Sequence, residues 1–224
     1  MKNHHAENAN KHHLSLGADR IDSSGYRSRM KFGVIAFFCL LSIVGNIATS
    51  FLASALHAPI FLDTIFTVAI TFYAGLVPGL IVAALHNPIV TFIYAVIYEI
   101  EIFYFACFYA ICGMLIVFST WLFSRNKKEF FFNRTVLYLL IIVFVSSFLS
   151  CFSASALDTF IRPLLNDSLR FFPTDIFSIP FQKLKFGMFL SYLLPRIPIT
   201  VLDRLICTFS GFGLYRLVER RISC

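Results

Sequence analysis

The chain has 224 residues, of which 58% are hydrophobic, 14% are charged and 28 are phenylalanine. Soluble domains contain about 25% charged residues, and a soluble globule of this composition would expose large apolar patches. The composition therefore excludes a soluble domain, and it excludes disorder outside about the first thirty residues. The net charge of +7 comes from basic residues in blocks beside the apolar runs, which indicates membrane topology rather than nucleic-acid binding.

Residues 1–31 form a polar tail, which we predict to be cytoplasmic and disordered. Its two histidine pairs, His4-His5 and His12-His13, are compatible with a metal site or with a solvated tail, and the absence of a fixed ligand geometry favours the tail. The six cysteines form no CxxC pair and no Cys/His ligand spacing, so we expect neither a zinc site nor a disulfide framework. We expect no cofactor.

Residues 32–224 are predicted to form an all-α integral membrane domain with six transmembrane helices. The six apolar segments are, in chain order, Phe32–Leu52, Ile60–Val77, Pro78–Tyr98, Ile102–Phe123, Thr135–Ala156 and Ile199–Val218. His86-Asn87-Pro88 interrupts the third segment. An irregular outer stretch, 157–198, precedes the sixth segment; its apolar piece Phe186–Leu194 is too short to cross as a helix, and we interpret it as interfacial or re-entrant.

The basic residues predict the orientation of these segments. They gather in the tail, in the loop 125–134 and at the chain end, 216–221. With six crossings these regions share one side, which the positive-inside rule makes cytoplasmic. We therefore expect a multi-pass protein of the inner (plasma) membrane with both termini in the cytoplasm. The outer stretch is an exception, since it carries five Lys or Arg residues on the opposite side.

Charged residues inside the apolar runs are the candidate functional groups, because a charge at mid-bilayer costs about 2.5–3.5 kcal/mol. On the six-crossing map Asp63, Asp158 and Asp203 converge on the outer half. They could also simply lie near the outer headgroups. Asp203 and Arg204 lie several residues inside the last run, about 100° apart on a helix, so we expect them to contact different neighbours. Arg162 and Arg196 are candidate partners of Asp203.

Uncharged polar residues give weaker signals. Thr64, Thr67 and Thr71 share one helical face, which either lines a polar cavity or bonds back to its own helix carbonyls. Asn46 and the His86-Asn87 pair either bind a ligand or hold helices together. Gly75 and Gly79 flank Pro78, which favours a tight turn over a helix-dimer face.

Catalytic patterns are absent from the sequence, which contains no HExxH, GxSxG or Walker motif. Asp63 and Asp203 both lie near predicted helix ends, which argues against an intramembrane aspartyl dyad. We therefore predict that the protein is not an enzyme.

Three stretches resemble a known family. They are Phe61-Leu62-Asp63-Thr64-Ile65-Phe66-Thr67, the Gly-rich turn from Gly75 that leads to the central Asn87, and Leu202-Asp203-Arg204-Leu205-Ile206. The sequence is similar there to the substrate-binding S components of energy-coupling factor (ECF) transporters, and to related membrane domains ahead of some sensor kinases. The resemblance covers the second, third and sixth segments. Phe66 stands where the family usually has Gly, and the first segment lacks the family's A-x-x-x-A pattern.

The resemblance implies six helices, cytoplasmic termini and a ligand pocket in the outer half. It implies capture of a small, vitamin-like molecule, which a transmembrane coupling subunit driven by two ATPases then takes over. The resulting candidate substrate-binding residues are Asp63, Thr64, Thr67, Asn87, Asp158, Asp203 and Arg204. The alternative function is a sensory or structural membrane module without transport activity, with a cytoplasmic partner on 1–31 or 124–134. The expected partners are the ligand, the lipid bilayer and the transporter subunits, and not nucleic acid.

Overall fold

The computed structural model describes residues 32–56, 58–99, 101–125, 132–165, 173–185 and 187–222. The predicted disordered tail and its histidine pairs lie outside these residues. The chain divides into two compact units, 1–37 and 38–224. The packing described below is that of the second unit.

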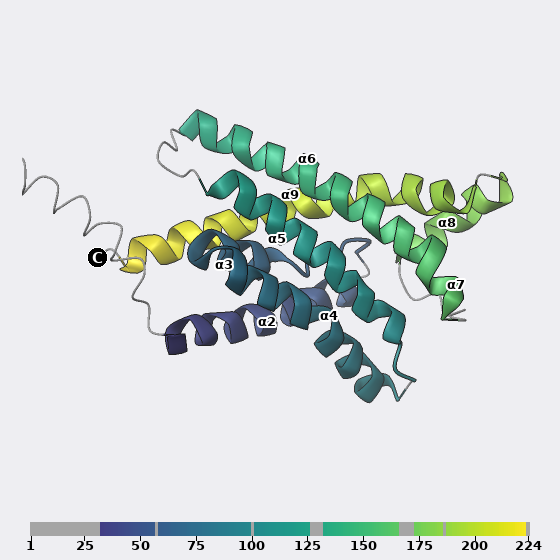
Figure 1. The fold of residues 1–224 in the computed structure, drawn as a ribbon, viewed down its shortest axis with the longest axis horizontal. Helices are drawn as coiled ribbons and strands as arrows, with labels where there is room; N and C mark the ends of the chain where they lie inside the picture. The colour runs from purple at the N-terminus through teal and green to yellow at the C-terminus, as the bar shows by residue number, and fades with distance from the viewer. Residues whose placement is uncertain are drawn as a thin grey trace, which may run out of the picture. The chain divides into compact units, whose positions relative to one another are not determined.

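Every regular element among the described residues is helical (Figure 1), which confirms the all-α prediction. The long helices are α2 (Phe32–Ala55), α4 (Leu76–Tyr98), α5 (Ala110–Ser124), α6 (Phe132–Ala156) and α9 (Met188–Ile222). The shorter elements are α3 (Ile65–Ala74), the 3-10 helix η2 (Tyr104–Tyr109), the π-helical turn η4 (Leu157–Ile161), α7 (Arg162–Leu164) and α8 (Pro173–Lys183).

Five helical stretches are long and apolar enough to cross a membrane. They are Gly33–Ala55, Leu76–Tyr98, Tyr104–Ser124, Thr135–Leu164 and Met188–Arg221. Large apolar side chains on them point outward, for example Leu40, which is 64% exposed, and Phe148, which is 70% exposed. Such surfaces suit lipid and not water, so the chain has the character of a multi-pass membrane protein.

The second predicted segment is a shorter helix than the other five. Its helix, α3, has 10 residues, which span about 15 Å of a hydrocarbon layer about 30 Å thick. Residues 58–64 before it are not helical. Gly75 after it has φ 93°, a left-handed conformation that favours glycine. The predicted turn between two helices is therefore present at Gly75.

Two predicted interruptions are helical in the structure. The Phe186–Leu194 piece does not stand apart from the last helix, since α9 begins at Met188 and continues through Pro195 and Pro198. Helix α4 likewise runs through Pro88. Proline usually interrupts a helix because it lacks an N–H donor. Membrane helices nevertheless tolerate proline when neighbouring groups satisfy the freed carbonyls.

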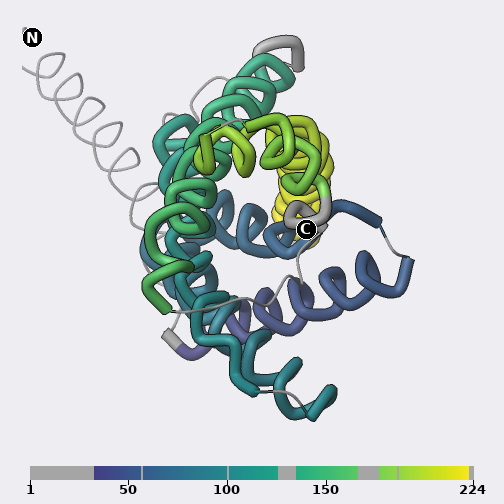
Figure 2. Tube along the Cα trace, turned by 90° about the vertical axis from the view of Figure 1, so that its right-hand side faces the viewer, coloured from purple at the N-terminus to yellow at the C-terminus, as the bar shows by residue number. Residues whose placement is uncertain are grey.

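Helices α2 and α4 run parallel to each other. Near one end the Cys39 thiol donates to the Pro78 carbonyl at 4.0 Å, and near the other end the Phe51 and Tyr94 rings stack with centroids 5.1 Å apart. The chain between these helices must therefore return along the bundle. Figure 2 shows α3 between α2 and α9 within the second unit.

An apolar cluster holds α3, α5, α6 and α9 together at one end of the second unit. Its buried members are Val68, Phe72, Ile116, Leu139, Ile142 and Tyr215. Close approach is possible because Gly211 on α9 faces α3: a Cβ there would meet the Ile65 carbonyl oxygen at 2.7 Å. In lipid such contacts stabilise through dispersion and fit rather than through release of water.

Candidate functional site

An ion pair lies in the middle of α9, between the neighbours Asp203 and Arg204. The Arg204 Nη2 donates to Asp203 Oδ2. Asp203 is fully buried and Arg204 is 4% exposed. The expectation that the two side chains contact different neighbours is therefore only partly right, because the long arginine side chain turns back across the 100° between them. The pairing offsets part of the cost of burying these two charges.

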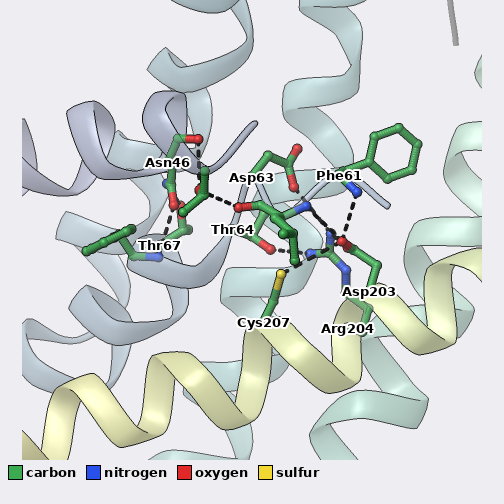
Figure 3. Close-up of polar contacts among 11 residues, drawn as sticks. Asn46, Phe61, Asp63, Thr64, Thr67, Asp203, Arg204 and Cys207 are labelled. Carbon is green, nitrogen blue, oxygen red and sulfur yellow. Dashed lines mark hydrogen bonds and ion pairs between the residues drawn. The ribbon is translucent and has the colours of Figure 1, made fainter. Parts of the chain in front are cut away.

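Asp203 also holds the non-helical segment 58–64 (Figure 3). Its Oδ1 accepts hydrogen bonds from the backbone N–H groups of Phe61, at 3.0 Å, and Leu62, at 2.9 Å. The Thr49 hydroxyl donates to the Leu62 carbonyl at 2.6 Å. Leu62 has φ 49°, an uncommon conformation for a residue with a Cβ. Irregular backbone inside a membrane needs such partners, because no water is there to provide them.

Arg204 reaches from α9 to the residues that lead into α3. Its Nη1 donates to the Thr64 hydroxyl at 2.6 Å, and its Nη2 lies 3.4 Å from Asp63 Oδ1. Asp63 retains an exposed side-chain fraction of 24%. One guanidinium therefore links two carboxylates and a hydroxyl, as Figure 3 shows.

Asn46 on α2 completes the start of α3. Its Oδ1 accepts the Phe66 N–H at 2.9 Å, and its Nδ2 donates to the Thr67 hydroxyl at 2.7 Å. The first N–H groups of a helix have no partner within the helix, so Asn46 acts as a cap from a neighbouring helix. Asn46 is fully buried, which favours the packing alternative over direct ligand contact.

The threonine stripe is hydrogen-bonded within the protein. Thr71 donates back to the Thr67 carbonyl at 2.6 Å, while Thr64 and Thr67 accept from Arg204 and Asn46. All three threonines are buried. Thr71 thus follows the predicted bond back to its own helix, whereas Thr64 and Thr67 bond to side chains of α9 and α2.

The ring of Phe66 on α3 lies against Gly45 on α2. A Cβ on Gly45 would meet Phe66 ring carbons at 2.7 Å. The missing side chain on α2 therefore provides the space that the phenylalanine on α3 fills.

A second ionic cluster surrounds Asp158, in the π-helical turn after α6. The Tyr109 hydroxyl donates to Asp158 Oδ1 at 2.6 Å, and Arg196 Nη2 donates to Oδ2 at 2.6 Å. Arg162 Nη1 lies 3.6 Å from Oδ1. The prediction that Arg162 or Arg196 pairs with Asp203 is therefore wrong, since both arginines lie beside Asp158. Arg204, directly next to Asp203 in the chain, occupies that role.

The interruption in the third segment contributes His86 rather than Asn87. His86 is 4% exposed, and its Nδ1 has no hydrogen-bond partner among the described residues. Asn87 is half-buried and makes no side-chain hydrogen bond within the described part of the chain. The sequence identifies both residues as candidates. Which of them is buried depends on the rotation of α4, and that rotation is set by how α4 packs.

The structure thus divides the seven predicted site residues. Asp63, Thr64, Asp203 and Arg204 form one network, whereas Thr67 bonds to Asn46 at the start of α3. Asp158 belongs to the second cluster, and Asn87 to neither. Tyr109 was not recognised from sequence, because nothing local distinguishes it from the other aromatic residues of its segment.

No group of three or more His, Cys, Asp or Glu side chains within the described ranges is placed to hold a metal ion. No protein-family model, curated protein or solved structure matches the chain. The functional argument therefore rests on the residues and their geometry.

Proposed function

We propose that the protein is a six-crossing component of an uptake transporter in the inner (plasma) membrane, similar to an ECF S component. It captures a small molecule in the outer half of the membrane and passes it to a transmembrane coupling subunit with ATPases. The observation that carries this proposal is the network of Asp63, Asp203 and Arg204. It joins a broken membrane segment to the last helix and leaves hydrogen-bonding groups unused beside it.

The parallel course of α2 and α4 supports a sixth crossing by residues 58–74. Seven residues reach at most roughly 23 Å, the bend at 59 and the turn at 63–64 shorten that reach, and the ten residues of α3 add about 15 Å. The two pieces together are comparable with the hydrocarbon thickness of about 30 Å. The bonds from Asp203 and Thr49 satisfy part of the non-helical stretch, as irregular backbone at this depth requires.

The basic residues support the same count. In Figure 1 the start of α4, the last turns of α5, the first turns of α6 and the C-terminal end of α9 lie at one end of the second unit. The α5–α6 junction and the end of α9 carry basic residues in the sequence, among them Lys127, Lys128, Arg220 and Arg221. Six crossings place both on the cytoplasmic side with the basic tail, whereas five would separate the tail from them.

The depth of each cluster follows from positions along α9. If Arg216 marks the inner interface, Arg204 lies about 18 Å farther along the helix and Arg196 about 30 Å, at roughly 1.5 Å per residue. In a hydrocarbon layer about 30 Å thick, the Asp203 network then lies just beyond the midplane, and Asp158 lies at the outer boundary. A ligand site beside Asp63 is accordingly reached from outside.

Co-purification tests the proposed function. The tagged full-length chain is isolated in mild detergent from its own cells, and mass spectrometry identifies both bound proteins and bound small molecules. We expect one small molecule per chain, together with a coupling subunit and ATPases. Loss of the small molecule in Asp63→Asn but not in Glu101→Gln, an exposed acid at the link between α4 and α5, would localise it.

The proposal would be overturned if the wild-type chain were recovered with no small molecule and no transporter subunits. A cytoplasmic protein captured alone by 1–31 or 124–134 would indicate a sensory module instead.

Reporter fusions test the crossing number separately. A fluorescent protein that folds only in the cytoplasm is fused after Cys224 or inserted between Lys127 and Lys128, in a chain that is otherwise complete. Six crossings with a cytoplasmic tail predict fluorescence from both positions. Alkaline phosphatase, which is active only outside the cytoplasm, is fused at the same two positions in a second set of chains. Its activity at both positions, together with a cytoplasmic N-terminus, would instead show that 58–74 does not cross.

A further inference from the structure

We infer that the turn between α8 and α9 binds the headgroups of anionic phospholipids at the surface of the bilayer. Helix α8 ends at Lys183 and α9 begins at Met188, so the turn is short. The inference rests on the proposed function only for the side of the membrane, because the proposed orientation makes this the outer leaflet.

Two exposed lysines belong to this turn. Lys183 is the last residue of α8, and Lys185 lies two residues beyond it. Neither side chain has a hydrogen bond or an ion pair with another described residue. A lysine in the last turn of a helix complements the helix dipole, but Lys185 lies outside α8. The turn therefore presents positive charge that the described part of the protein does not use.

The other bases of the outer stretch that the structure describes are used by the protein itself. Arg162 and Arg196 are buried and bind Asp158. Lysines on the outer side of a membrane oppose the positive-inside rule, so an interaction specific to that side has to favour them. Anionic headgroups supply it, since each lysine near an anionic membrane surface favours binding roughly fivefold.

Large apolar side chains accompany the lysines. Leu184 is 69% exposed, and Phe177 and Met188 are each 47% exposed. Exposed apolar side chains next to lysines are typical of segments in the membrane interface, where the apolar groups lie among the headgroups and the ammonium groups meet the phosphates. A soluble polyanion would account for the lysines but would leave these apolar side chains in water. The composition of the turn therefore favours a lipid surface.

The backbone holds the turn in a defined shape. The Leu184 N–H donates to the Pro180 carbonyl and the Lys185 N–H donates to the Gln182 carbonyl, both at 3.1 Å. Lys185 has φ 59°, a left-handed conformation that is uncommon for a residue with a Cβ. Because the turn is already ordered, headgroup binding has only side chains left to order.

The depth of the turn fits this partner. In Figure 1 the turn lies at the end of the second unit opposite the C-terminal end of α9. On the depth scale given above, Arg196 lies at the outer boundary of the hydrocarbon, and Met188 lies about 12 Å farther along α9. The headgroup layer is about 5–8 Å thick on each side, and a tilt of α9 shortens the rise along the membrane normal. Long lysine side chains at this level reach the phosphates.

Photocrosslinking tests this inference on the full-length protein in nanodiscs that contain equal parts of anionic phosphatidylglycerol and zwitterionic phosphatidylcholine. Photoreactive p-benzoylphenylalanine is introduced at Leu184, and mass spectrometry measures which lipid forms the adduct. We expect phosphatidylglycerol adducts to exceed phosphatidylcholine adducts about fivefold or more. Lys183→Gln with Lys185→Gln should bring the ratio close to one. The matched control, Arg220→Gln with Arg221→Gln, removes two charges from the other end of α9 and should leave the ratio unchanged.

The failures of this inference and of the proposed function are distinguishable. Equal yields of the two lipid adducts with both lysines present would overturn the anionic preference. Adducts with protein alone, or no lipid adduct, would overturn the lipid contact itself. If the variant labelled at Leu184 does not fold, the same label at Met188 replaces it. Absence of ligand and transporter subunits would overturn the proposed function but would leave the lipid ratio unaffected.

Discussion

The two buried ionic clusters are both built around an arginine of α9, yet they hold different kinds of structure. In the first, which we call the latch, Asp203 and Arg204 bind the backbone and side chains of residues 61–64. In the second, which we call the clamp, Arg196 and Arg162 bind Asp158, with the Tyr109 hydroxyl as a further donor. The latch secures a segment without helical structure, whereas the clamp joins segments that are themselves helical.

The latch and the clamp therefore use the same kinds of side chain for different structural purposes. The latch carboxylate replaces water for a broken segment, so its removal leaves two backbone donors without an acceptor and leaves Arg204 with Thr64 and the 3.4 Å contact to Asp63. The clamp distributes one carboxylate over two guanidinium groups, so the loss of one base leaves the other in place. The latch also contains the partly exposed Asp63, which we connect with ligand binding. The clamp binds Asp158 to groups on α9, α7 and η2 and so holds these elements together.

The largest effect is expected from removing the latch carboxylate. Asp203→Leu should lower the free energy of unfolding by about 3–5 kcal/mol, because the buried Arg204 loses its buried ion-pair partner and keeps only the partly exposed Asp63 at 3.4 Å, and two N–H groups lose their acceptor. Denaturant titration of the purified protein in detergent measures this. A loss below about 1 kcal/mol would show that Asp203 does not secure the 61–64 segment.

A double-mutant cycle separates the two contributions of Asp203. Asp203→Asn keeps an oxygen for the Phe61 and Leu62 N–H groups but removes the charge that Arg204 needs. If the ion pair dominates, adding Arg204→Gln should recover part of the loss, because the buried charge disappears with its partner. Additive losses would mean that the backbone bonds carry the stability.

A smaller effect is expected from the clamp. Arg196→Gln should cost about 2 kcal/mol, less than the loss of a buried ion pair usually costs, since Arg162 stays 3.6 Å from Asp158. The same denaturant titration measures it. If Arg196→Gln proved as costly as Asp203→Leu, the distinction between latch and clamp would fail.

The sequence predicted the parts of this fold that depend on hydropathy. Five long apolar helices form where apolar runs lie, and Gly75 turns the chain between the short α3 and α4. Helix ends were less predictable. Pro195 and Pro198 suggested that α9 begins near Ile199, although it begins at Met188, because the cost of proline depends on neighbours that the sequence does not show.

The candidate site was predictable in its members but not in its pairings. Charges inside apolar runs identified Asp63, Asp158, Asp203 and Arg204 as buried polar groups. Their partners lie up to 142 residues away along the chain, so local spacing carries no signal for them. The assumption that neighbours 100° apart diverge treated side chains as rigid, whereas a long arginine side chain reaches across that angle. His86, and not Asn87, is the buried residue of its pair. The rotation of α4 decides between the two, and packing sets that rotation.

Close packing of α3 on α9 is what brings the latch together, and Gly211 tests it. Gly211→Ala places a Cβ 2.7 Å from the Ile65 carbonyl oxygen and 2.9 Å from the Val68 Cβ, which should cost about 1–3 kcal/mol by overpacking. Gly213→Ala on the same helix meets nothing within 4 Å and should be neutral or slightly stabilising. Equal unfolding midpoints for the two variants in thermal scans would argue against the close approach.

The smallest effect is expected at the cap of α3, and it shows whether the cap belongs to the latch. Asn46→Ala should cost about 1–2 kcal/mol, because the Phe66 N–H loses its acceptor. Ser42→Ala, one turn earlier on α2, is the matched control: the Ser42 hydroxyl bonds only its own helix, at the Phe38 carbonyl, and its loss should be near neutral. Denaturant titrations of Asn46→Ala, Asp203→Asn and the double variant then give the coupling between cap and latch. If the start of α3 and segment 61–64 move as one unit, the double variant loses less than the two single losses together. Additive losses would show that the latch secures 61–64 without help from α2.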